Sequence, residues 1–192
     1  LVMAKIIYPE TQPSESRNDL NFSTERPDSN AMEALSRGAS DGLKLAANVA
    51  AMLIAFISFV ALINYLLTFA QTSLQEILGF IFKPLAWSMG VPWNEAQLVG
   101  SLMGEKITLT ELIAYSNLRD LRLEHAISER TTIIASYALC GFANFGSIGI
   151  QLGGIGAMAP ERKKALSTLA LKAMIGGALA SWMTASIAGI LI

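Results

Sequence analysis

The chain of 192 residues is 53% hydrophobic and only 15% charged, against roughly 25% charged residues in an ordinary soluble domain. This composition excludes a typical soluble globular protein and predicts a polytopic membrane protein. The net charge is -1, and because no basic patch with interleaved aromatic residues occurs, we expect no nucleic-acid partner. A single cysteine, Cys140, excludes an internal disulfide.

The N-terminal region divides into an apolar stretch and a polar linker. Residues 1–8 are apolar except for Lys5 and lack the pattern of a signal peptide, so we interpret them as the end of a preceding transmembrane segment. Residues 9–30 are rich in Pro, Ser, Asn, Asp and Glu, which is typical of a solvated linker. We therefore expect the C-terminal portion of a longer protein, with this linker on the cytoplasmic side.

A long helix is predicted over residues 31–73. No charged residue occurs from Leu45 to Gln75, and this run exceeds the ~20 residues that cross the hydrocarbon core. The helix should be tilted or extend beyond the membrane. Residues 74–93 contain charged residues, Pro84 and two tryptophans, a mixture that favours an interfacial helix followed by a turn.

Residues 94–116 contain two short apolar arms around a polar midpoint. The arms, 96–103 and 107–115, are each too short to cross a membrane alone. A re-entrant helical hairpin is predicted, with its tip around Gly104–Thr108 enclosed by protein. The alternative is a single amphipathic helix on the membrane surface.

The segment from Thr131 to Pro160 has no charged residue and is long enough to cross a bilayer. Its middle, Cys140–Ser147, places glycines around an Asn and a Ser. Backbone groups within hydrocarbon must be satisfied, so such residues indicate an interrupted helix beside protein or a polar cavity. Broken helices of this kind hold substrates and ions in secondary transporters. We therefore predict a broken helix over residues 131–160.

The remaining segments set the predicted topology. Residues 117–130 are rich in charge and are predicted to be an external loop, whose Ser128 can cap the following helix. A last helix is predicted over residues 161–192. Because Arg162–Lys164 form the densest positive cluster, the turn that holds them should be cytoplasmic and the C-terminus extracytoplasmic. The predicted fold is an all-α polytopic membrane protein.

Glu111 is the sharpest candidate for a binding residue. It lies in the apolar arm 107–115, and a carboxylate at membrane depth costs from ~3 to more than ~10 kcal/mol, so it usually faces a cavity or a partner. A carboxylate accepts several hydroxyl hydrogen bonds, which suits a vicinal diol. The alternative is an interfacial glutamate whose carboxylate reaches water.

Three residues of the predicted break are further candidates. Asn144 and Ser147 lie three apart and should point to one side of a helical turn. Phe142 offers an apolar face to a ring-bearing ligand, and an Asn can both donate to and accept from a polar molecule. The alternative is that Asn144 satisfies the broken backbone itself, and the two roles are compatible. One isolated histidine and no paired acids at depth leave no convincing catalytic set.

Four long motifs follow one another along the chain: Gly90–Ala96, Thr110–Tyr115, Ala138–Ile148 and Gly153–Lys163. Together they resemble the C-terminal half of the concentrative nucleoside transporters, and the likeness covers nearly the whole chain. The resemblance implies half of an inverted-repeat transporter: a sodium- or proton-coupled nucleoside symporter of the plasma membrane. It further implies a homotrimer surrounded by membrane lipid, no organic cofactor, and a long helix that is both scaffold and trimer contact.

The resemblance also assigns the site. A glutamate in the family's Asn-Glu-Phe-Val-Ala-Tyr arm binds ribose hydroxyls, and Glu111 occupies that place. The positions of Phe142, Asn144 and Ser147 line the nucleoside site in that family. Two departures, Thr110 and Gly146, leave fine substrate preference open.

The family's base-binding Gln-Thr-Glu motif and its sodium residues have no counterpart in this sequence, so no metal site is expected in it. The coupling ion and the choice between purine and pyrimidine nucleosides stay open. The alternatives are a membrane channel or structural subunit, and an intramembrane enzyme.

Overall fold

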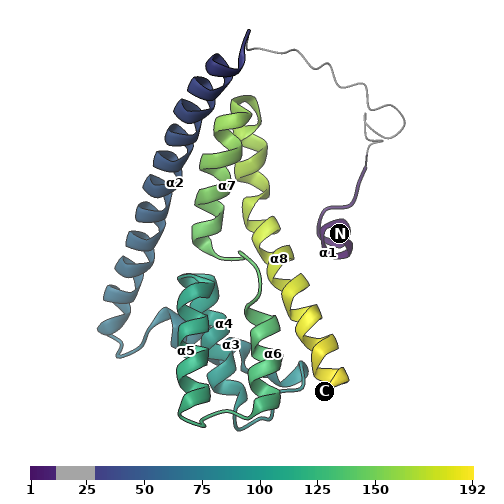
Figure 1. The fold of residues 1–192 in the computed structure, drawn as a ribbon. Helices are drawn as coiled ribbons and strands as arrows, with labels where there is room; N and C mark the ends of the chain where they lie inside the picture. The colour runs from purple at the N-terminus through teal and green to yellow at the C-terminus, as the bar shows by residue number, and fades with distance from the viewer. Residues whose placement is uncertain (12–28) are drawn as a thin grey trace.

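The computed structural model describes residues 1–11 and 29–192, and every regular element in these ranges is helical (Figure 1). Most of the predicted linker, residues 12–28, lies outside the described residues. The α-helices are α1 (Val2–Ile7), α2 (Ala31–Thr68), α3 (Leu74–Ser88), α4 (Ala96–Thr108), α5 (Glu111–Leu123), α6 (Glu129–Leu139), α7 (Phe145–Met158) and α8 (Lys163–Leu191). A turn of 3-10 helix, Pro160–Arg162, precedes α8.

The predicted long helix is present as α2. Its N-terminus is capped by Asn30, whose side chain accepts a hydrogen bond from the backbone N–H of Glu33. The helix has 38 residues, which at the rise of an α-helix is about 57 Å, well beyond the ~30 Å of a bilayer core. It ends at Thr68, five residues before the predicted end at 73. By length and composition, α2 and the segment Pro160–Leu191 could each cross a membrane.

Helices α4 and α5 form a hairpin, but its turn is not where the sequence predicted it. Helix α4 continues without a break through Gly104 to Thr108, and the chain turns at Leu109 and Thr110. The predicted tip at Gly104–Thr108 is therefore wrong, and so is the alternative of one surface helix. A Cβ on Gly104 would lie 2.9 Å from the carbonyl oxygen of Gln75, so this glycine permits close contact with α3 instead of forming a turn.

The segment before the hairpin is a helix followed by a turn, as predicted, whereas the segment after it differs from the prediction. Helix α3 ends at Ser88, and the turn after it contains Gly90 with a φ of 101°. Helix α5 extends to Leu123, so only residues 124–128 of the predicted charged loop 117–130 lie between helices. Arginine and leucine are good helix formers, and the charges of Arg119 and Asp120 lie on the exposed side of α5, paired at 2.8 Å.

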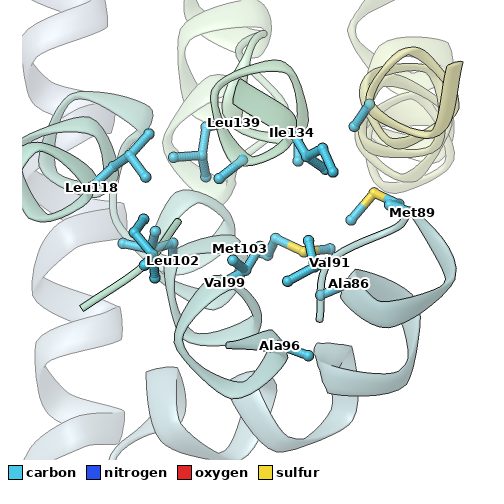
Figure 2. Packing of buried hydrophobic residues seen from close by; sticks show 14 of the residues in the cluster. Ala86, Met89, Val91, Ala96, Val99, Leu102, Met103, Leu118, Ile134 and Leu139 are labelled. Carbon is cyan, nitrogen blue, oxygen red and sulfur yellow. The ribbon is translucent and has the colours of Figure 1, made fainter. Parts of the chain in front are cut away.

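A core of apolar side chains joins the hairpin to α6. Figure 2 shows labelled side chains of α4, α5 and α6 gathered together, with Met89 and Val91 from the turn after α3 beside them. Leu102 of α4 and Leu139 of α6 are each at most 2% exposed. Close packing of such side chains brings many van der Waals contacts, each worth only about 0.1–0.2 kcal/mol but substantial in sum, so α6 is held against the hairpin.

The predicted broken helix is confirmed as α6 followed by α7, with residues 140–144 outside both helices. Gly141 has a φ of 104°, a backbone conformation that glycine adopts without steric cost. Helix α8 contacts both halves, whereas α2 contacts α7 (Figure 1). Ser128 caps α6 as predicted, because its side chain accepts from the backbone N–H of Thr131 at 3.2 Å.

Candidate functional site at the break between α6 and α7

Asn144 and Ser147 form a reciprocal cap at the start of α7. The Asn144 Oδ1 accepts from the backbone N–H of Ser147 at 2.6 Å, and the Ser147 Oγ accepts from the backbone N–H of Asn144 at 3.2 Å. Both residues are buried, at 3% and 4% exposure. The first N–H groups of a helix lack partners within it, and this cap satisfies one of them. Asn144 therefore does satisfy the broken backbone, as the alternative interpretation held.

The same asparagine also contacts Glu111. Because Oδ1 is engaged in the cap, the amide nitrogen points outward, and Nδ2 donates to the Glu111 Oε2 at 2.9 Å. Glu111 is the first residue of α5, directly after the N-cap Thr110. Its half-buried carboxylate therefore lies near the N-termini of both α5 and α7. Helix N-termini carry partial positive charge that stabilises an anion.

Three neighbouring helices donate hydrogen bonds to the carbonyl end of α6. The Tyr115 hydroxyl of α5 donates to the Ser136 carbonyl oxygen at 2.6 Å. The Lys106 Nζ of α4 donates to the carbonyl oxygens of Ala138 at 3.0 Å and Cys140 at 3.3 Å. The Ser181 Oγ of α8 also donates to the Cys140 carbonyl oxygen. The last four carbonyls of a helix lack partners within it, so these donors supply hydrogen bonds that the broken backbone itself cannot make.

Lys106 is the residue near the site that sequence reasoning missed. It was assigned to a polar hairpin tip, yet its side chain is completely buried. A lone charge in an apolar arm is costly in a membrane, and that same signal identified Glu111. The signal was hidden because Gly104-Glu105-Lys106 has the composition of a turn.

Phe142 lies apart from the Glu111–Asn144 pair. It is 72% exposed and, together with Ser147 and Gln151, lines a cavity of about 240 Å³ between the break and α8. The structure thus brings Glu111, Asn144 and Ser147 into one connected set, and places Phe142 on the adjoining cavity. Within residues 1–11 and 29–192, no group of three His, Cys, Asp or Glu side chains is arranged to hold a metal ion.

Comparison with known proteins gives a consistent picture. The family model described as "Na+ dependent nucleoside transporter C-terminus" matches residues 1–189. The uncharacterized transporter YutK of Bacillus subtilis is 42% identical over all of this chain and 49% of its own length. The nucleoside permease NupC of Helicobacter pylori is 41% identical over all of this chain and 48% of its own length. The chain thus spans about half the length of these relatives.

Solved structures agree with the sequence relatives. A double variant of the transporter CNTnw in an outward-facing state superimposes with a TM-score of 0.85 at 38% identity, covering 98% of this chain and 46% of that protein. The matches confirm the resemblance stated from the four motifs, and they confirm that the chain belongs with transporters and not with enzymes. The chain is therefore a member of the Na+-dependent nucleoside transporter family, a family of membrane proteins, and corresponds to the C-terminal part of its members.

Proposed function

We propose that the chain is the C-terminal half of an ion-coupled nucleoside symporter and that it binds the ribose of the nucleoside between the α4–α5 hairpin and the break of α6 and α7. The observation that carries this proposal is the hydrogen bond of 2.9 Å between the Asn144 Nδ2 and the Glu111 Oε2. It joins two polar side chains from segments that are 33 residues apart in sequence. Membership of a nucleoside transporter family supports the substrate class.

The chemistry of the pair suits a ribose diol. The Glu111 Oε2 accepts a hydrogen bond from Asn144, whereas no donor from the described residues bonds to the Glu111 Oε1. A carboxylate accepts up to about four hydrogen bonds, so room remains for the two adjacent hydroxyl groups of ribose. Hydrogen bonds to a charged acceptor contribute roughly 1.5–3 kcal/mol each.

Ser147 and Phe142 have supporting roles in this proposal. The Ser147 Oγ donates to the Asn144 carbonyl oxygen at 2.6 Å, so it holds the asparagine in place as well as lining the cavity. Phe142 presents its exposed ring to the same cavity, where an aromatic surface can pack against a ring-bearing ligand. The nucleobase and the coupling ion are assigned to residues that are not in this chain.

The proposal extends to the whole transporter. It is a homotrimer of the plasma membrane, with the turn at Arg162–Lys164 cytoplasmic and the C-terminus extracytoplasmic. Na+ or H+ drives uptake, and the family description favours Na+. Collapsing the sodium and proton gradients separately during uptake identifies the ion, and downhill flux that persists without either gradient would instead indicate a channel.

The direct test is uptake by the complete transporter that carries Glu111→Gln. Glutamine can still accept from the Asn144 Nδ2, so the substitution removes charge and leaves the pair connected. Loss of one charge-assisted hydrogen bond of roughly 1.5–3 kcal/mol corresponds to a rise in KM of roughly 10- to 150-fold. A 2′,3′-dideoxynucleoside lacks the diol, so its KM should differ little between the wild-type and the Glu111→Gln transporter.

The matched control is Glu161→Gln, which removes one carboxylate from the exposed turn before α8. It should leave KM unchanged. An unchanged KM for ribonucleosides in the Glu111→Gln protein would overturn the assignment of Glu111 to the ribose.

A further inference from the structure

Lys106 is a fully buried cation whose structural partners are backbone carbonyls. The structure places no described carboxylate within salt-bridge distance of its ammonium, which instead donates to Ala138 and Cys140. Burying a charge costs several kcal/mol unless its surroundings compensate. A shorter apolar side chain would fill this part of the packed core without that cost. The presence of a charged side chain here therefore indicates a function for the ammonium group.

The position of the ammonium gives the first part of that role. Ala138 lies in the last turn of α6, and Cys140 follows its final residue. The C-terminal end of a helix carries partial negative charge on carbonyls that have no partner within the helix. The Lys106 ammonium therefore completes both the hydrogen bonding and the charge balance of the break.

Two bridges join the same two segments of chain. The first links Lys106, in the last turn of α4, to the end of α6. The second links Glu111, at the start of α5, to Asn144, at the start of α7. Residues 107–110 separate Lys106 from Glu111, and residues 141–143 separate Cys140 from Asn144. Because these separations are short, we expect loss of the first bridge to shift the atoms of the second, even though the Tyr115–Ser136 hydrogen bond and the apolar core also hold α6 against the hairpin.

We propose that Lys106 is a positioning residue of the nucleoside site: it fixes the carbonyl end of α6 to α4, and so keeps Asn144 opposite Glu111. It acts on the substrate only through that pair. This inference rests on the proposed function, because the effect of Lys106 on binding is defined by the ribose site.

The test compares four variants of the complete transporter by their KM and by uptake per molecule of transporter in the membrane. Lys106→Met retains the length of the side chain but has no donor, and we expect its KM for a ribonucleoside to rise by about 10-fold or more. Lys106→Arg keeps donors for both carbonyls and should lie near the wild type. The double variant Lys106→Met with Glu111→Gln should be little worse than Glu111→Gln alone, because residues that act on one contact are not additive.

The control is Lys164→Met, the same substitution on an exposed lysine in the first turn of α8. Its KM should match the wild type. If Lys106→Met does not reach the membrane, Lys106→Gln, which keeps two N–H donors without the charge, is measured instead, with a KM expected above that of Lys106→Arg.

The outcomes separate the two proposals. If Glu111→Gln raises KM and the Lys106 variants do not, the positioning role is overturned and the ribose site stands. If Lys106→Met lowers only the amount of transporter, or if the double variant shows the full product of the two single effects, Lys106 has a structural role alone. If Glu111→Gln leaves KM unchanged, the ribose site itself is wrong.

Discussion

The close packing of α3 against α4 permits one effect to be worked out from geometry. A Cβ on Gly100 would lie 2.4 Å from the carbonyl oxygen of Gly79 and 3.1 Å from the backbone nitrogen of Lys83. Real Cβ atoms essentially never approach closer than 3.0 Å, so Gly100→Ala must displace α3 by about 0.6 Å, the difference between 3.0 and 2.4 Å. The obstacle is backbone and cannot rotate away, and overpacking of this kind costs roughly 1–3 kcal/mol.

Gly100→Ala should therefore lower the apparent unfolding temperature of the purified transporter. The measurement uses one heating rate, because large proteins often unfold irreversibly. Gly42→Ala is the matched control, since a Cβ at that position in α2 would meet nothing within 4 Å and alanine is favoured over glycine inside a helix by roughly 0.5–1 kcal/mol. If the Gly100→Ala protein unfolds at the same temperature as the Gly42→Ala protein, the described contact between α3 and α4 is refuted.

Two further predictions concern the break. Asn144→Ser keeps an acceptor for the start of α7 but loses the Nδ2 donor to Glu111. The unfolding temperature should therefore stay the same, while KM for nucleosides should rise. An unchanged KM would show that the Asn144 Nδ2 takes no part in nucleoside binding. Gly141→Ala places a Cβ 3.2 Å from the Ser181 Oγ at a φ of 104°, and the left-handed backbone costs other residues roughly 1–2 kcal/mol, so the unfolding temperature should fall. An undiminished value would contradict the observed path of residues 140–144.

The break and its polar residues could be predicted because their signal is local. Glycines beside Asn144 and Ser147 within an uncharged stretch leave few interpretations in a membrane protein, where unsatisfied backbone is costly. The cap of α6 by Ser128 could also be predicted from local sequence, because a cap joins residues that are three apart. Glu111 followed from the cost of a carboxylate in an apolar arm.

The hairpin turn and the role of Lys106 could not be predicted because their causes are distant in sequence. Gly104 was assigned to the turn, yet Gly104, like Gly100, is needed to let α4 approach α3. The acceptors of the Lys106 ammonium lie 32 and 34 residues away. Helix α5 was shortened in the prediction because charge was taken to mean a loop, although charged residues such as Arg119 also suit the exposed side of a helix.

The break has a mechanical consequence for any molecule that occupies it. Helix α6 packs against the hairpin core and α7 packs on α2, while the continuous helix α8 contacts both. Residues 140–144 are the flexible connection between α6 and α7 only as far as α8 allows, and the hydrogen bond from Glu111 to Asn144 spans this connection. A ligand bound there contacts residues on both sides of the break, so it can favour one arrangement of α6 and α7 over another only by the difference in its affinity for each. Any such rearrangement must also be accommodated by α8.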